Sequence, residues 1–259
     1  MPQPLAVGVV LLAGLTGAGC SAGTSPADSA PTESAQPAPP ESVAGRFSSA
    51  QELGEAVRDA ALDAGSARGT VDARSADGLV SGALVYQFGA DVKLAGEVSV
   101  SEPVSADLGV VWTADVTYLR LPSLAQVFVG SEWVRVSADD TSDTAVQIAD
   151  LADVLGADVP GTSLLMDDRR DATVTYVGEQ RLDGAAVEQY LIEWDDGTVT
   201  TTEQYWIDSD DLLLRLDSAQ RGPAGDVAES QRTYTDWGES VVVQEPPAED
   251  VGDLPEGFF

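Results

Sequence analysis

Apolar and polar side chains alternate with a period of two through much of this chain. In residues 92–100 (VKLAGEVSV) the large apolar side chains occur only at every second position, with Lys93, Glu97 and Ser99 between them. Such alternation predicts a strand with one buried face. Residues 84–88 alternate in the same way, and Gly89-Ala90-Asp91 supplies the turn between the two predicted strands.

Later segments extend this pattern into a meander. The segment Leu108–Leu121 carries apolar residues on both faces, which predicts one long central strand that is covered on both sides over part of its length. Shorter strands are predicted at 126–129 and 132–136, joined as a hairpin by Gly130-Ser131. After Arg170 the alternation returns and predicts five more strands: 172–181, 185–194, 199–207, 212–216 and 230–237. Strands joined by such short turns pair antiparallel. Pro246-Pro247 is expected to keep the tail from extending the ladder far.

Two segments have helical spacing instead. Ser48 or Ser49 is expected to cap a helix that runs to about Ala64, and Glu52 stands at the capping-box position after Ser49. A second helix is predicted over Thr141–Leu155, followed by a short apolar piece at 163–166. The pattern therefore predicts one α+β domain.

The first 46 residues are of a different kind. A short apolar run ends in small residues and Cys20, the only cysteine in the chain, which is typical of a lipoprotein signal peptide although Gly17 stands where such peptides usually have leucine. The alternative is a plain secretory peptide and a buried free thiol. We expect a signal peptide at 1–19, lipidated Cys20 and a disordered Ser/Ala/Pro/Thr-rich tether at 20–46, a folded domain at 47–251 and a tail at 252–259. The anchor would hold the protein on the outer face of the cytoplasmic membrane.

Charge and composition narrow the function classes. The chain has 44 acidic and 13 basic residues, a net charge of −31, which disfavours nucleic-acid binding. Histidine is absent, so Ser-His-Asp and Cys-His nucleophile systems and the commonest zinc ligand are excluded. The acidic pairs lack the spacing of a twelve-residue calcium loop and fit turn chemistry instead. We expect no metal, no cofactor and no enzymatic activity. The basic pair Arg169-Arg170 could meet an anionic headgroup at a cavity mouth, or lie in solvent beside Asp167-Asp168.

The order of elements and several motifs resemble the LppX/LprA/LprF/LprG lipoprotein family of actinobacteria, within the wider LolA/LolB-like superfamily. The resemblance covers about residues 47–251 and rests on Cys20 with its tether, the helical insertion Thr141–Met166, and the motifs at 174–178 (VTYVG), 204–208 (QYWID), 234–238 (YTDWG) and Pro246-Pro247. It implies an α+β fold with a single strongly curved antiparallel sheet, a half-barrel, and helices on the concave side. An apolar cavity between them would hold the acyl chains of a lipid or glycolipid.

Twelve residues are expected to line that cavity: Leu84, Tyr86, Val92, Leu94, Val110, Trp112, Val116, Leu151, Leu155, Leu164, Leu165 and Met166. The alternative for each is an ordinary sealed core, because a lipid cavity and a core require the same residue types. The expected function is non-enzymatic binding or transfer of a lipid by a monomer. A sensor or protein-interaction module with the same fold and no bound lipid is the alternative.

Overall fold

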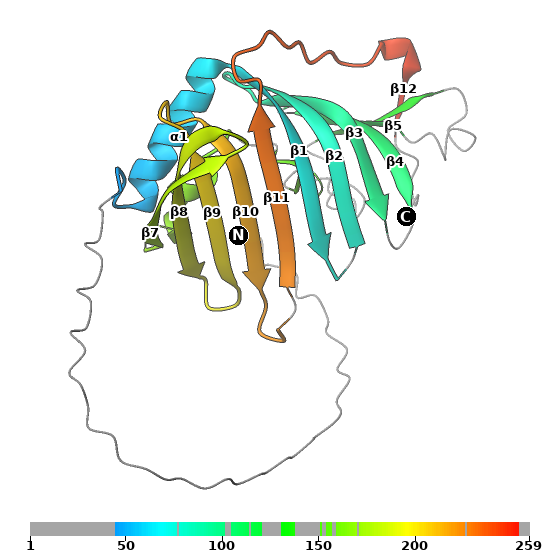
Figure 1. Ribbon diagram of the computed structural model, residues 1–259. Coiled ribbons are helices and arrows are strands. Elements are labelled where there is room, and N and C mark those ends of the chain that lie inside the picture. Colours follow the sequence, from blue (N-terminus) through cyan, green and yellow to red (C-terminus); the bar gives the residue numbers. More distant parts are fainter. Residues whose placement is uncertain are drawn as a thin grey trace, which may run out of the picture. The chain divides into compact units, whose positions relative to one another are not determined.

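The computed structural model describes residues 45–76, 78–101, 105–113, 115–120, 131–137, 151, 154–156, 159–169, 171–225 and 227–253. Their dominant feature is one open, curled sheet of twelve strands (Figure 1). The strands are β1 (Ser66–Ser75), β2 (Gly78–Gln87), β3 (Lys93–Ser101), β4 (Ala106–Trp112), β5 (Val116–Arg120), β6 (Trp133–Ser137), β7 (Thr173–Leu182), β8 (Ala185–Asp195), β9 (Thr200–Ile207), β10 (Leu213–Arg221), β11 (Val227–Thr235) and β12 (Val251–Asp253). The α+β class and the single curved antiparallel sheet are as predicted.

Two meanders make up this sheet. Strands β1–β6 and β7–β11 each pair in chain order, and the two halves join where β1 pairs antiparallel with β11. The backbones come close there, since a Cβ on Gly69 would lie 2.4 Å from the carbonyl oxygen of Thr233. Short β12 adds to the far edge in parallel with β6. The strand order therefore places segments from both ends of the chain at the centre of the sheet.

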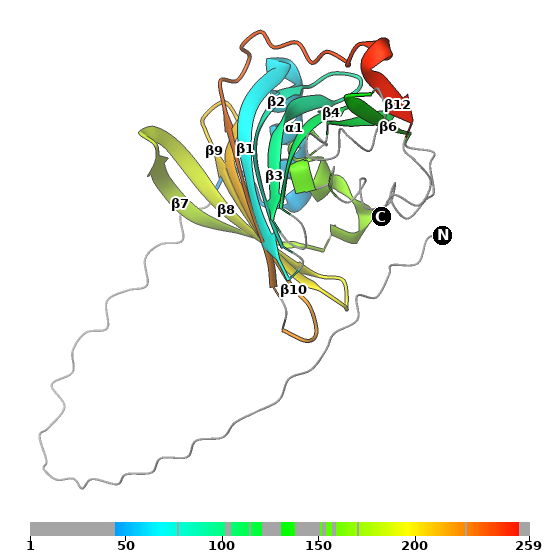
Figure 2. The same ribbon diagram turned by 90° about the vertical axis from the view of Figure 1, so that its right-hand side faces the viewer.

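The helix α1 (Ala50–Ala64) packs on the concave side of the sheet, together with the short 3-10 helices η2 (Thr162–Leu165) and η3 (Asp167–Arg169) (Figure 2). The predicted cap is confirmed: the Ser49 hydroxyl accepts from the Glu52 backbone N–H at 3.2 Å. The Glu52 carboxylate accepts in turn from Ser48, whose backbone N–H lowers the pKa of Glu52. No helix among the described residues is long and apolar enough to cross a membrane.

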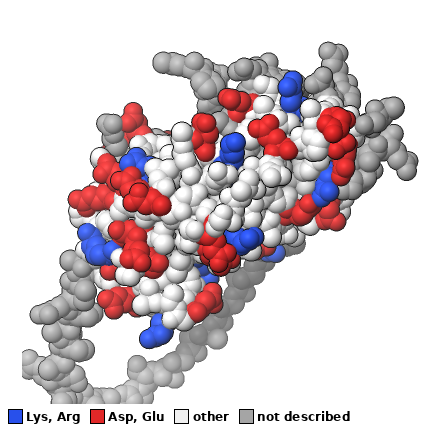
Figure 3. All heavy atoms as spheres, turned by 90° about the horizontal axis from the view of Figure 1, so that it is seen from above, with Lys and Arg blue, Asp and Glu red and all other residues white. Residues whose placement is uncertain are grey.

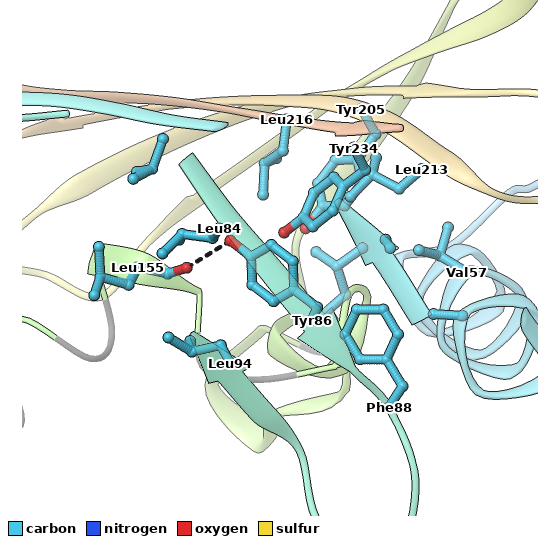
Figure 4. Packing of buried hydrophobic residues seen from close by; sticks show 14 of the residues in the cluster. Val57, Leu84, Tyr86, Phe88, Leu94, Leu155, Tyr205, Leu213, Leu216 and Tyr234 are labelled. Atoms are coloured by element: carbon cyan, nitrogen blue, oxygen red, sulfur yellow. Dashed lines mark hydrogen bonds between the residues drawn. The ribbon is translucent and has the colours of Figure 1, made fainter. Parts of the chain in front are cut away.

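A continuous hydrophobic core lies between α1, η2 and the concave face of the sheet. Leu53 and Val57 of α1 are fully buried in it, together with Tyr86 and Leu94 from the sheet. Figure 4 shows Tyr86 packed between Leu84 and Phe88, with its hydroxyl donating to the Leu155 carbonyl oxygen at 2.9 Å. Burial of these large side chains fixes which face of each strand points inward.

The predicted long strand Leu108–Leu121 is wrong, because the chain turns back within it. Reciprocal backbone hydrogen bonds join Thr113 and Val116, at 2.9 and 3.3 Å, and close a hairpin between β4 and β5. The turn resets the alternation, so Val116 shares a face with Tyr118 and Val111 and not with Val110. These residues form a second apolar cluster on the outer face, covered by Val243 of the segment after β11. The apolar residues on one face of this region therefore belong to the main core, and those on the other face belong to this second cluster.

Other boundaries differ in smaller ways. Strand β1 was not delimited from the sequence, and β12 forms although Pro246-Pro247 precedes it, after the turn η4 (Ala248–Asp250). The five strands predicted after Arg170 are all present, although β10 and β11 have shifted ends. The predicted strand 126–129, its turn residue Gly130, residues 1–44 including Cys20, and most of the predicted helix 141–155 lie outside the described residues; Leu151, Val154 and Leu155 of that helix are helical.

Gly45 and Arg46, which the sequence assigns to the tether, lie against the sheet instead. The Arg46 guanidinium pairs with Glu188 at 2.8 Å and with Asp211 at 2.6 Å. Its backbone N–H donates to the Tyr190 hydroxyl at 2.9 Å. These contacts attach the residues before α1 to β8 and to the turn after β9.

Candidate ligand-binding site

A cavity of about 420 Å³ lies on the concave side, between the sheet and the residues around η2. Its apolar wall comes from Val154, Val159 and Met166 on the covering side and from Leu213 and Leu216 on the sheet. Ligand pockets in proteins commonly measure about 300–1,000 Å³, so this space is large enough for a small ligand. The mixed lining favours a molecule with both apolar and polar parts.

The register of the sheet explains why there is space at this place. One transverse row of inward positions runs Glu203, Ser218, Ser230, Ala73 and Val80 across β9, β10, β11, β1 and β2. The three central members are small. The neighbouring rows toward α1 carry large buried side chains such as Tyr205, Leu216 and Tyr234 (Figure 4). The core is thus filled at one end of the concave face and left open at the other.

A buried carboxyl lies at the inner end of the cavity. Glu203 is 7% exposed, and its carboxylate accepts a hydrogen bond from the Tyr205 hydroxyl at 2.8 Å. Burial raises the pKa of Glu203, against the opposing effects of Tyr205, Arg169 and Arg232. Burial and the neighbouring negative charge of Glu203 also raise the pKa of Tyr205 well above its usual value. The net effect is that the interior disfavours a charged Glu203.

Two arginines face this carboxyl. Arg169 lies over the ring of Trp194, with its guanidinium carbon 4.4 Å from the ring centroid, and its Nη1 is 3.9 Å from Glu203 Oε1. That separation is too long for a hydrogen bond. Nε and Nη1 of Arg169 are buried and have no hydrogen-bond partner among the described residues. Of the two readings of Arg169-Arg170, the solvated one therefore does not hold for Arg169, and Arg170 is outside the described residues.

Arg232 and Tyr86 hold the covering segment in place, that is, the described residues 154–156 and 159–166 that cover the cavity. Arg232 donates from Nε and Nη2 to the Val154 carbonyl oxygen, at 3.2 and 3.1 Å, and Tyr86 donates to the next carbonyl oxygen, that of Leu155. Gly156 follows in a left-handed conformation with φ of 73°, and a Cβ there would approach the Arg232 guanidinium to 3.3 Å. The cover of the cavity is thus attached to the sheet by a few polar contacts.

The residues predicted to line a cavity are mostly placed elsewhere. Met166 lines this cavity and is 46% exposed. Six are fully buried in the core: Leu84, Tyr86, Leu94, Val110, Leu155 and Leu164. Three pack partly buried against it: Val92, Trp112 and Leu151. Leu165 lies beside Gly54 of α1, and Val116 is on the opposite face of the sheet.

The polar cavity residues Glu203, Tyr205 and Arg232, and the row of small ones, were missed from the sequence. A signal was present, since the charged Glu203 and Arg232 stand at inward positions of β9 and β11, next to the aromatic Tyr205 and Tyr234. A charged residue at an inward position of an alternating strand indicates either a buried partner or a site.

The acidic pairs at the turns have structural roles. The Asp196 carboxylate accepts from the backbone N–H groups of Thr198 and Val199, both at 2.7 Å, which lowers the pKa of Asp196. Asp208 likewise accepts from the N–H groups of Asp210 and Leu212. These carboxylates close their own turns, as the turn interpretation predicts.

Replacing Glu203 with glutamine should stabilise the protein at neutral pH. The pKa of Glu203 is raised in the folded state, so the free energy of unfolding contributed by this group falls as pH rises through that pKa. Thermal unfolding from pH 8 downward should show Glu203→Gln melting higher than the wild type, with the gap closing toward the pKa of an unfolded glutamate, about 4.3. A gap that widens as pH falls would contradict this placement of Glu203.

Comparisons with known proteins give only distant likenesses. No protein-family model matches the chain, and a search of curated proteins finds no match. Among solved structures, MucB in complex with MucA(peri) is 13% identical with a TM-score of 0.40, covering 77% of this chain and 59% of MucB. A DUF1329 family protein from Desulfovibrio piger is 11% identical with a TM-score of 0.31, covering 74% and 93%. A putative outer membrane lipoprotein-sorting protein domain from Vibrio parahaemolyticus is 11% identical with a TM-score of 0.26, covering 72% and 90%. The chain thus spans about three-fifths of the MucB chain, and the function rests on its own geometry.

Proposed function

We propose that the protein is a non-catalytic, membrane-anchored lipid-binding lipoprotein that holds an acyl chain in the cavity between residues 154–156 and 159–166 on one side and the sheet on the other. The observation that carries this proposal is the cavity of about 420 Å³ with an apolar wall and a charged inner end. The resemblance of the sequence to the LppX/LprA/LprF/LprG lipoproteins points to the same class of ligand, a lipid or glycolipid.

The apolar wall is sufficient to hold a chain without polar chemistry. Each buried CH₂ group contributes about 0.8 kcal/mol, so about ten methylenes against Val154, Val159 and Leu216 would contribute about 8 kcal/mol. Met166 lies half-exposed at this wall, and its unbranched side chain can adapt to ligands of different length. Binding would then be governed by the shape of the cavity.

Access to the cavity would depend on the covering segment. Its described polar contacts to the sheet include those of Arg232 to Val154, of Tyr86 to Leu155 and, at 3.4 Å, between the hydroxyls of Ser163 and Tyr205. Hydrogen bonds of this kind each contribute about 0.5–1.5 kcal/mol, or more from a charged donor, so thermal fluctuation can break them transiently. Entry of a chain would use this movement, and transfer would need no chemical step.

The anchor at Cys20 would place this cavity at the outer face of the cytoplasmic membrane. Replacing Cys20 with alanine removes the only thiol that can take a diacylglycerol. The variant should leave the membrane fraction almost completely, as measured by cell fractionation and immunoblotting. Ser21→Ala, one residue further on, is the matched control and should stay with the membrane. Membrane retention of Cys20→Ala would rule out lipidation at this residue.

A second function, a sensor or protein-interaction module, is supported by the edge of the sheet. Strand β7 ends the strand order, so its outer edge pairs with no described strand, and Val177 beside its bulge is 50% exposed. An unpaired edge can accept a partner strand.

Titration with the neutral apolar dye 1-N-phenylnaphthylamine distinguishes the two functions. The mature chain carrying Cys20→Ala should show one saturable fluorescent site that a lysophospholipid displaces. The absence of any saturable site would exclude the lipid-binding function and favour the interaction module.

A further inference from the structure

The charges inside the cavity are opposite to those of the protein as a whole. The chain carries a net charge of −31, and on the face seen in Figure 3 acidic side chains are scattered among basic ones and outnumber them. Yet three of its 13 basic residues, Arg74, Arg169 and Arg232, line the cavity against the two carboxylates of Glu203 and Glu229. The cavity wall therefore keeps a net positive charge even when both carboxylates are ionised.

Of the two arginines that face Glu203, Arg169 is the one whose buried donors lack an acceptor in the described part of the chain. Its guanidinium stacks on Trp194, and its Nη1 lies 3.9 Å from Glu203 Oε1. Leaving donors of a charged group buried without acceptors costs more than leaving neutral ones, so native structures usually supply a partner. Among the described residues neither Nε nor Nη1 has a hydrogen-bond acceptor. The Arg169 side chain is 17% exposed and lines the cavity, so the oxyanion of a ligand can approach the guanidinium and supply an acceptor.

We propose that the cavity selects a single-chain amphiphile with an anionic head, a carboxylate or a phosphate monoester, and that Arg169 binds the head while the chain lies along Val154 and Met166. This inference rests on the proposed lipid-binding function and adds the charge and the number of chains of the ligand. Arg232, already bonded to the cover through Val154, adds positive charge to the same end.

The size of the cavity agrees with one chain. Its volume of about 420 Å³ is near the lower end of the usual range of ligand pockets. The small residues of the transverse row leave space along the sheet between Glu203 and Val80. A neutral glyceride with several chains would leave the guanidinium unpaired and exceed this space.

Three probes with the same chain test the selectivity: palmitate, hexadecyl phosphate and hexadecanol. The mature chain carrying Cys20→Ala should bind the two anions about tenfold or more tightly than the alcohol, because hydrogen bonds to charged groups contribute about 1.5–3 kcal/mol. The ratio between palmitate and hexadecyl phosphate tells which head is preferred. In Arg169→Gln the preference for the anions should disappear while the affinity for hexadecanol stays unchanged.

Arg215 provides the matched control. It also lies over a tryptophan ring, that of Trp206 at 4.8 Å, but on the outer face and paired with Asp217. Arg215→Gln should leave all three affinities unchanged. If Arg169→Gln weakens hexadecanol as much as palmitate, the arginine has a structural role and the inference is wrong.

Glu203→Gln should act in the opposite direction and strengthen anion binding about threefold or more, because it removes the negative charge beside the head. Opposite changes in two variants cannot both arise from misfolding. Equal binding of anion and alcohol by the wild type would overturn this inference and leave the lipid-binding function intact. Failure of all three probes to bind would overturn both.

Discussion

Replacing Gly54 with valine should lower the free energy of unfolding by about 3 kcal/mol, near the upper end of overpacking costs. In an open helix position a glycine costs up to about 1 kcal/mol relative to alanine, so a side chain there would usually help. At Gly54 it cannot, because a Cβ would lie 2.9 Å from both the Gly161 carbonyl oxygen and the Leu164 Cβ. The helix α1 would be pushed away from η2, which forms part of the cover of the core.

Thermal unfolding measures this effect directly. For a domain of this size, 3 kcal/mol corresponds to a fall in melting temperature of about 6–12 °C. Glu55→Val, the next residue along α1 on its exposed side, is the matched control and should change the free energy of unfolding by about 0.5 kcal/mol. If both variants melt alike, α1 and η2 are not in close contact in solution.

Replacing Ser218 with phenylalanine should abolish ligand binding without destabilising the fold. Ser218 is the small residue beside Glu203 in the transverse row, and its side chain points into the cavity. A benzyl group there would occupy the space of the acyl chain and bury apolar surface at the same time. We expect the affinity for any acyl ligand to fall more than tenfold, while the melting temperature stays the same or rises.

A phenylalanine at the neighbouring residue, on the outer face of β10, shows whether the loss of binding comes from filling the cavity or from added bulk in general. Ala219 follows Ser218 on β10, and alternation places it on the outer face. Ala219→Phe adds nearly the same bulk outside the cavity and should leave binding unchanged. Equal loss of binding in both variants would place the ligand somewhere other than the concave face.

The local elements of this fold could be predicted from the sequence because their signals are local. The capping of α1 by Ser49 and Glu52 depends on residues three apart, and the tight turns at Asp195 and Asp208 depend on their own side chains. The pairing of β1 with β11 could not be predicted from these signals. It joins residues more than 150 positions apart, and the alternation in each strand is compatible with several partners.

The error at Leu108–Leu121 shows the limit of periodicity. The two-residue turn between β4 and β5 reverses the chain and shifts the alternation by one residue, but apolar residues on both faces hide this shift in the sequence. The cavity was misplaced for a related reason. Large apolar residues were taken as its lining, but such residues fill space, as Tyr86 and Leu94 do. The open space lies where Ser218, Ser230 and Ala73 come into register, and that register depends on the pairing of strands distant in sequence.

The most direct test of a cavity that holds an acyl ligand is native mass spectrometry of the protein from its own host. The mature chain with Cys20→Ala, secreted and purified without detergent, should carry a noncovalent adduct with the mass of a single-chain anionic lipid. Ala219→Phe should keep this adduct, and Ser218→Phe should lose it. A wild-type protein without any lipid adduct, or a Ser218→Phe protein that retains it, would contradict the account.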